Sequence, residues 1–167
     1  RCLEAVAEAL AQRPTVVTFP VAAFARPLLR TRCIMNAVPI PELAHTDALK
    51  AARRLWRRTL GSCALQAMEA SVLGEQRIGD IPGFMIPGLW LEYSASASSE
   101  PETFESMGKI ADHNALDVVS LARLFFRIER IMAQPELRWA ADKVYAPRLA
   151  AELMALGREA EGLSILE

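Results

Sequence analysis

The sequence predicts an α/β fold that is mostly helical in this stretch and ends in a helical hairpin. Residues 15–19 form a β-branched run of strand length without a charge. A strand that is apolar on both sides is typical of a sheet covered on both faces. By contrast, apolar residues recur at three- and four-residue steps over residues 108–132, which indicates a long helix. One strand among many helices is typical of one flank of an α/β fold.

The composition limits the classes of protein to which this chain can belong. The chain has 167 residues, of which 52% are hydrophobic and 23% charged, with a formal net charge of −1. These values fit a soluble globular domain and exclude a disordered chain. No apolar run reaches the roughly 18 residues of a membrane-spanning helix, so we expect no membrane partner. Cys2, Cys33 and Cys63 are widely spaced and odd in number, which predicts reduced thiols in a cytoplasmic protein.

The first sixty residues alternate helix and strand patterns. The expected elements are a helix over residues 3–10, a strand over 15–19, a helix over 24–35 and a candidate short strand over 43–46. Asp47 is the expected N-cap of the next helix, which runs to about Arg58, because its carboxylate can accept from free backbone N–H groups.

From residue 61 onward every expected regular element is a helix. Proline and glycine predict an irregular loop over residues 79–88, and a Ser/Ala-rich loop is expected over 94–99. The expected helices cover residues 64–73, 89–93, 100–130, 139–157 with an interruption at Pro147, and 160–166. Gly157 is the expected C-terminal cap of the fourth of these helices.

The helix over residues 100–130 carries the most distinctive pair. His113 and Asp117 are four residues apart, so an imidazole and a carboxylate lie on one helix face, one turn apart. The expected buried stripe of this helix consists of Val118, Leu121, Phe125, Ile128 and Met132. Spacing alone also fits an ordinary pair on a solvated face.

A basic cluster precedes residue 60. Arg53, Arg54, Arg57 and Arg58 lie within six residues, just after Lys50. A solvated helix face explains such a cluster without any function. A phosphate-facing patch becomes a credible alternative only if a nucleic-acid site is argued separately. Arg53, Arg54 and Arg57 are therefore the candidate nucleic-acid-binding residues.

Four segments in a fixed order carry a family resemblance. They are Val16-Val17-Thr18-Phe19 with residues 27–32, His45-Thr46-Asp47 with residues 52–56, Gly61-Ser62-Cys63 with Met68-Glu69 and Val72-Leu73-Gly74, and Asp80-Ile81-Pro82-Gly83 leading to His113-Asn114 and Asp117-Val118. Together they resemble the YprB-type ribonuclease-H-like domain of the DEDD 3′–5′ exonuclease superfamily. The resemblance covers roughly residues 3–130 and implies a partial ribonuclease-H-like fold in this chain.

The resemblance implies phosphodiester hydrolysis with Mg²⁺ or Mn²⁺. Two cations about 4 Å apart activate a water and stabilise the leaving oxygen, and hard cations prefer carboxylate oxygens. The family pattern has two acids on the first strand, an aspartate after a later strand and an aspartate on the last helix. By resemblance Asp117 is that last metal ligand, and His113 is the catalytic residue that handles the attacking water.

The other ligands do not carry over. The first-strand pair is expected before Arg1, because the chain does not start with Met and stops within a helical pattern, as part of a longer protein would. The middle aspartate belongs to an Asn-Gly-x-x-Phe-Asp pattern, in which Phe24 is kept while Pro20 replaces the asparagine and Ala25 the aspartate. Since Asp117 alone cannot neutralise two dications, we expect neither a complete cation site nor measurable hydrolysis by this chain.

Other conspicuous residues have ordinary explanations. Three acids that could in principle substitute as ligands are a helix cap, Asp47, a loop-turn residue, Asp80, and an exposed helix charge, Asp112. His45 is expected to be a hydrogen-bonded structural residue. Trp56 and Trp90 are expected in the core.

The chain is expected to contain a ribonuclease-H-like domain over residues 1–133 that lacks its first strands, and a helical tail over residues 134–167. Leu149, Leu153, Gly157, Ala160 and Leu163 fit the rhythm of tetratricopeptide-type repeats. The tail is thus the start of such a repeat, or alternatively a plain docking helix pair, and it is a candidate surface for a protein partner.

The sequence therefore predicts a nucleic-acid-processing domain that resembles metal-dependent 3′–5′ exonucleases and is inactive as this chain stands. The alternative is a catalytically dead domain that binds nucleic acid or supports helical repeats. DNA and RNA stay equally open as partners. A chance match to an unrelated helical protein is the third alternative.

Overall fold

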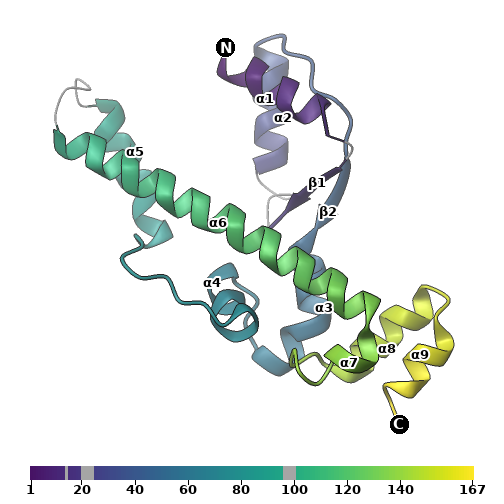
Figure 1. The fold of residues 1–167 in the computed structure, drawn as a ribbon. Coiled ribbons are helices and arrows are strands. Elements are labelled where there is room, and N and C mark those ends of the chain that lie inside the picture. The colour runs from purple at the N-terminus through teal and green to yellow at the C-terminus, as the bar shows by residue number, and fades with distance from the viewer. Residues whose placement is uncertain (14, 20–24, 96–100) are drawn as a thin grey trace. The chain divides into compact units, whose positions relative to one another are not determined.

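The structure of the chain is a computed structural model and describes residues 1–13, 15–19, 25–95 and 101–167 (Figure 1). It divides into two compact units. The first contains Arg1–Cys63 and Phe125–Glu167, and the second contains Ala64–Leu124. The long helix α6, Pro101–Ala133, contributes residues to both units. The predicted division at residue 133 stays a prediction.

The first unit holds a pair of parallel strands. Its elements before residue 63 are α1 (Cys2–Ala11), β1 (Thr15–Thr18), α2 (Ala25–Met35), β2 (Ala44–Asp47) and α3 (Ala48–Leu60). Thr15 lies opposite Ala44 and Thr18 opposite Asp47. Since parallel neighbours need a crossover connection, α2 lies in the segment that links them. Both predicted strands are confirmed.

The strands are less covered than their sequence predicts. Thr18 is buried, but Val16 and Val17 are half-buried and Thr15 is exposed. The expectation of a sheet covered on both faces is therefore wrong for the described residues. Thr18 and His45 share a hydrogen bond of 2.7 Å between Oγ1 and Nε2, so the structural role expected of His45 is confirmed.

Helix α3 anchors the core of the first unit. Asp47 caps it as predicted, with its carboxylate accepting from the backbone N–H of Lys50 at 3.2 Å. Trp56 is fully buried, and its indole N–H donates to the carbonyl of Asp142 at 2.7 Å. The core position expected for this tryptophan is confirmed. The indole thus fastens α3 to the turn that precedes helix α8 (Ala146–Ala155).

The C-terminal helices are shorter than expected. They are α7 (Pro135–Arg138), α8 (Ala146–Ala155) and α9 (Glu159–Ser164). The expected helix over residues 139–157 is wrong in its first half, because residues 139–143 form turns and Pro147 lies in the first turn of α8. Proline is tolerated there because its missing N–H would have no partner. Gly157 follows α8 with φ +75°, which confirms it as the helix-ending glycine.

The second unit is built from short helical turns and the first part of α6. It contains α4 (Leu65–Met68), a π-helical turn (Glu69–Leu73), a 3₁₀ turn (Gly83–Met85) and α5 (Ile86–Ala95). The loop expected over residues 79–88 thus gives way to helical turns at Gly83, because Pro87 fits the first turn of α5. The loop expected over residues 94–99 falls largely outside the described residues. Trp90 is 51% exposed, so its expected core position is wrong.

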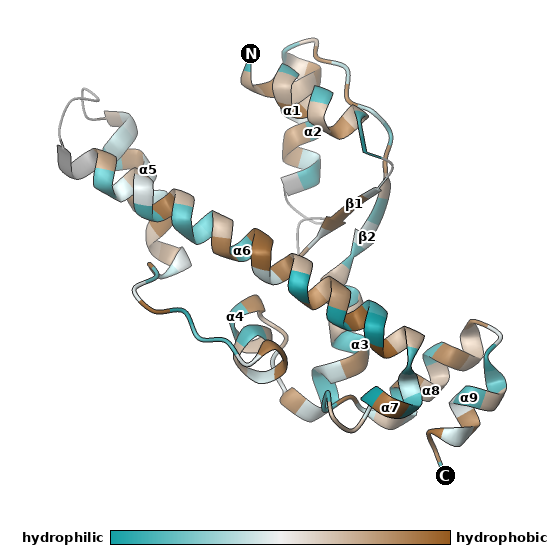
Figure 2. Ribbon diagram, viewed as in Figure 1, coloured by the Kyte–Doolittle hydropathy of each residue, from teal (hydrophilic) through white to brown (hydrophobic). Residues whose placement is uncertain are grey.

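Helix α6 buries a different stripe from the one its apolar residues predict. Val118 is 67% exposed, and Leu121, Phe125 and Met132 are half-buried. The buried positions are Ile110, His113, Ser120, Leu124, Ile128 and Ile131. Hydrophilic and hydrophobic residues follow each other along α6 in Figure 2. Polar side chains enter the buried stripe because hydrogen-bond partners offset the cost of removing them from water.

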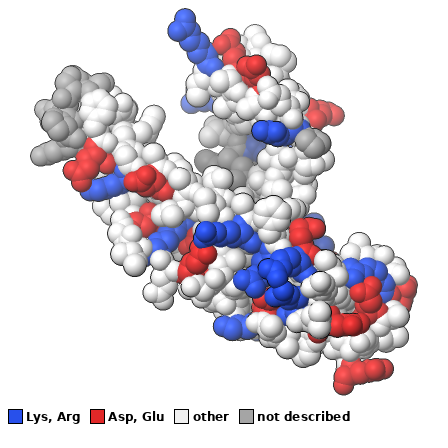
Figure 3. Space-filling model, viewed as in Figure 1, with Lys and Arg blue, Asp and Glu red and all other residues white. Residues whose placement is uncertain are grey.

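Charge and hydropathy add two general observations. Basic side chains, drawn in blue, and acidic side chains, drawn in red, both appear on the face shown in Figure 3, and the net charge of the whole chain is −1. Within the described ranges, no helix has both the length and the apolarity needed to cross a bilayer.

Candidate functional site

The predicted pair lies in a cluster of charged side chains in the second unit. Glu69 starts the π-helical turn, Arg77 and Asp80 lie in the segment that follows it, and His113 and Asp117 lie on α6. The side chains of Glu69, Arg77, Asp80 and His113 are only 4–9% exposed, whereas Asp117 is 43% exposed. π-Helical turns are rare and recur at functional sites.

A single guanidinium joins three carboxylates. Arg77 donates from Nε to Glu69 at 2.8 Å, from Nη1 to Asp80 at 2.9 Å and from Nη2 to Asp117 at 2.6 Å. A further bond from Nη2 completes a bidentate pair with Glu69. We call Arg77 with Glu69, Asp80 and Asp117 the arginine–carboxylate cluster. The guanidinium of Arg77 is planar and has several N–H donors, so it can bond several carboxylates at once. The compact ammonium group of a lysine lacks this geometry.

The imidazole of His113 is held by Asp80. Its Nδ1 lies 2.9 Å from both carboxylate oxygens of Asp80, so Nδ1 carries the proton that is donated. The other nitrogen, Nε2, is 3.7 Å from Oδ2 of Asp117. The structure therefore brings His113 and Asp117 together on one face, as their spacing predicts. It adds Asp80 as the residue that orients the ring.

Opposing effects set the pKa values in the cluster. Burial raises the pKa of Asp80, but hydrogen bonds from Arg77 and His113 outweigh burial and hold it below its usual range. Burial likewise raises the pKa of Glu69, and hydrogen bonds from Arg77 and Ser120 bring it below its usual range. The hydrogen bond to Glu69 raises the pKa of Arg77 above its usual value against the effect of burial. Both carboxyls are thus ionised and the guanidinium charged at neutral pH.

A hollow of about 410 Å³ lies beside this cluster. Glu69, Arg77 and Asp80 line it together with Gln66, Gln76 and Pro82, among others. All of these residues belong to the second unit. The more exposed carboxylate of Asp117 remains accessible to water. The arrangement presents Nε2 of His113 as a proton acceptor beside one partly exposed acid, Asp117.

The donor set does not fit the two divalent cations that the resemblance implies. Both oxygens of Glu69 are bonded to Arg77, Asp80 is divided between Arg77 and His113, and one oxygen of Asp117 is bonded to Arg77. Over residues 1–13, 15–19, 25–95 and 101–167, no three acidic, histidine or cysteine side chains are placed to hold one metal ion. A protein cation already neutralises the acids that a metal would need, so no reaction step is derived through a metal here.

The remaining candidate residues lie elsewhere or outside the description. Arg53, Arg54 and Arg57 are exposed on α3 in the first unit. Asp112 is exposed on α6, as expected. The pattern over residues 20–25 that lacks a carboxylate lies outside the described residues, apart from the helical backbone of Ala25.

A comparison of sequences identifies the family. A profile described as the RNase_H superfamily matches residues 1–128. The chain belongs to the RNase H superfamily. The two parallel strands with many helices fit part of a ribonuclease-H-like fold.

A curated relative narrows the branch of the superfamily. The uncharacterized protein YprB of Bacillus subtilis (strain 168) is 32% identical over 136 residues. The match covers 79% of this chain but only 32% of YprB, so the chain spans about a third of that relative's length. The predicted YprB-type ribonuclease-H-like domain is thereby confirmed. No solved structure matches the chain.

Sequence reasoning missed three members of the cluster. Asp80 has an ordinary explanation as a turn residue, but its side chain is 7% exposed and bonded to both Arg77 and His113. Glu69 and Arg77 carry no signal of their own, because neither stands at a recognisable spacing from His113. The usable signal was that Glu69 and Asp80 both lie in segments that carry the family resemblance.

Proposed function

We propose that this chain is the nucleic-acid-engaging part of a DEDD-type ribonuclease-H-like domain, with His113 and Asp117 as its remaining catalytic positions. We further propose that the chain as it stands does not hydrolyse phosphodiester bonds. Membership of the RNase H superfamily supports the substrate class. The bond from Arg77 to Asp117 at 2.6 Å supports the absence of hydrolysis, and the proposal depends on it most.

The physical reason lies in competition for the same oxygens. A metal ligand must offer a lone pair to the cation, and Asp117 already offers one oxygen to a guanidinium. Glu69 and Asp80 are buried with Arg77, so freeing them would leave Arg77 without its partners at a considerable cost. His113 keeps Nε2 available to accept a proton from water, because Asp80 holds the Nδ1 proton. General-base assistance without further stabilisation of the leaving oxygen supplies only part of the required rate enhancement.

A nuclease assay tests this proposal directly. The purified chain is incubated with labelled single-stranded and duplex DNA and RNA in the presence of Mg²⁺ or Mn²⁺, beside Asp117→Ala as the matched control. We expect oligonucleotide binding by both proteins and no metal-dependent product above the control. Cleavage that requires the metal and disappears in Asp117→Ala would refute the inactive state. A chain that binds none of the four substrates would refute the proposed substrate class.

A further inference from the structure

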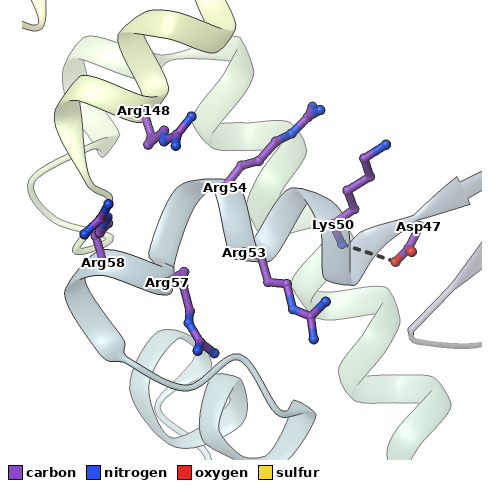
Figure 4. A pocket seen from close by; sticks show the side chains of 7 residues that line it. All are labelled: Asp47, Lys50, Arg53, Arg54, Arg57, Arg58 and Arg148. Carbon is purple, nitrogen blue, oxygen red and sulfur yellow. Dashed lines mark hydrogen bonds between the residues drawn. The ribbon is translucent and has the colours of Figure 1, made fainter.

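A stripe of basic side chains follows one face of α3 in the first unit. Lys50, Arg53, Arg54, Arg57 and Arg58 stand at positions i, i+3, i+4, i+7 and i+8. This is the spacing of residues on one side of a helix. Figure 4 shows them projecting from successive turns of α3, with Arg148 joining them from α8. These six residues and Asp47 line a hollow of about 460 Å³, which we call the basic hollow.

The basic side chains are exposed, and acids neutralise few of them. Arg54 pairs with Glu152 at 2.9 Å. Within the described residues, Arg53, Arg57 and Arg148 form no ion pair. Among the residues that the structure describes, Asp47 is the only acid that lines the hollow, and it is engaged in capping the helix. The hollow therefore presents an excess of positive charge although the whole chain is nearly neutral.

The fold gains little from this arrangement. Arginines in the last turn, Arg57 and Arg58, favour the C-terminal end of the helix dipole. However, Lys50 with Arg54, Arg53 with Arg57, and Arg54 with Arg58 are like charges four residues apart. Each such pair costs a helix a few tenths of a kcal/mol. The stripe is thus mildly destabilising in the absence of an anion.

We propose that the basic hollow binds the phosphate backbone of nucleic acid. This inference rests on the proposed function, which supplies the class of partner. It adds a second surface, which belongs to the first unit, whereas the arginine–carboxylate cluster belongs to the second. Five of the six basic residues are arginines. A guanidinium donates two parallel hydrogen bonds to a phosphate, so arginine is the residue that backbone recognition favours.

The lining of the hollow favours nucleic acid over other polyanionic partners. Of the described part of the chain, every residue that lines it is charged, and none is apolar or aromatic. A helix that binds a membrane surface needs apolar side chains to insert beside its basic ones. A protein interface needs an apolar core. Without aromatic side chains for stacking or groups aimed at base edges, the hollow reads the backbone alone and binds without sequence preference.

The length of the stripe sets the number of contacts. Lys50 and Arg58 are separated by roughly 12 Å along the helix axis, at a rise of 1.5 Å per residue. Since phosphates of one strand recur about every 3.4 Å along a duplex axis, the stripe spans about three or four of them. Arg148 widens the surface from a second helix. It lies outside residues 1–128, which match the superfamily profile.

Fluorescence anisotropy over a series of salt concentrations tests the surface. Labelled single-stranded RNA, single-stranded DNA and duplex DNA are titrated with the full chain, with Arg53→Gln/Arg57→Gln and with Arg148→Gln. The matched control is Arg26→Gln/Arg30→Gln, which removes two exposed arginines, also four residues apart, from α2. Circular dichroism verifies that each variant is folded. Vesicles containing phosphatidylserine form a separate arm.

We expect the Arg53→Gln/Arg57→Gln variant to bind roughly 25- to 60-fold more weakly at 0.1 M salt, with a salt slope lower by about 1.4–1.8, because two phosphate contacts are lost. Arg148→Gln should bind the oligonucleotide roughly 5- to 8-fold more weakly, because one phosphate contact is lost. The affinity of the α2 control should change little. Wild-type affinity in the α3 variant would overturn this surface while leaving the proposed function intact. Failure of the wild-type chain to bind any oligonucleotide would overturn both, and binding to vesicles alone would identify a membrane surface and overturn the proposal.

Discussion

Replacing Arg77 by methionine removes the guanidinium that three carboxylates share and keeps an unbranched apolar side chain in its place. Glu69 and Asp80 would then lose the cation that neutralises them while their side chains stay 4% and 7% exposed. Asp80 would keep its bond to His113, at 2.9 Å. The change therefore tests whether the cluster holds the second unit together.

The expected cost follows from burial. Removing one partner of a buried ion pair costs roughly 3–5 kcal/mol, because the other charge is left uncompensated. Asp117 adds little, since its side chain is 43% exposed and water can solvate it. We therefore expect Arg77→Met to lower the free energy of unfolding by about 3–5 kcal/mol. The total free energy of unfolding of a native domain is only about 5–15 kcal/mol.

Urea unfolding followed by circular dichroism measures this difference. The matched control is Arg123→Met, which breaks the exposed pair between Arg123 and Glu75 in the same unit and should cost less than about 1 kcal/mol. A second measurement repeats both experiments with Mn²⁺. Once Arg77 no longer occupies the carboxylates, the ion should raise the unfolding midpoint of Arg77→Met but not that of the wild-type chain.

Two results would refute the reasoning. A loss below about 1 kcal/mol in Arg77→Met would mean that the carboxylates are solvated rather than buried with the guanidinium. Stabilisation of the wild-type chain by Mn²⁺, to the same extent as the variant, would mean that Arg77 does not compete with a cation at these oxygens.

The remaining predictions concern pH and packing. The pKa values of Glu69 and Asp80 lie below the usual 4.5 and 3.8, so the stability that they contribute is present above those values and is lost as the pH falls below them; urea midpoints between about pH 6 and pH 3 measure the loss, and a flat profile would contradict it. In Gly162→Ala the new Cβ would lie 2.9 Å from the carbonyl oxygen of Ala150, which should cost about 1–3 kcal/mol in thermal unfolding, and an unchanged midpoint would show that α8 and α9 are not in contact. Trp56→Ala should cost about 3–5 kcal/mol because the side chain is fully buried, whereas a loss under 1 kcal/mol would place it outside the core.

Local sequence patterns predicted several elements of the fold. The run at β1 and the cap at Asp47 depend on neighbouring residues only, and the structure has both as predicted. The sequence predicted that Pro147 interrupts a helix over residues 139–157, whereas in the structure Pro147 lies in the first turn of α8. Proline can interrupt one helix or start another, and only the fold selects the start. The buried stripe that the apolar residues of α6 predicted differs from the observed one for a similar reason. Val118 is as apolar as a core residue, but burial depends on which side of the helix finds neighbours.

The sequence by itself determined the superfamily, the order of helices and strands through α3, and the placement of His113 and Asp117 on one helix face, since helical spacing places residues four apart one turn from each other. Only the tertiary structure decided that Arg77 and the carboxylate of Glu69 join them, and that Asp80 is a buried partner rather than a turn residue. The physical reason is that ion pairs between residues 8 to 40 positions apart leave no periodic trace in a sequence. They form only where the fold removes water from both charged groups, because each group then needs the other as its partner in place of water.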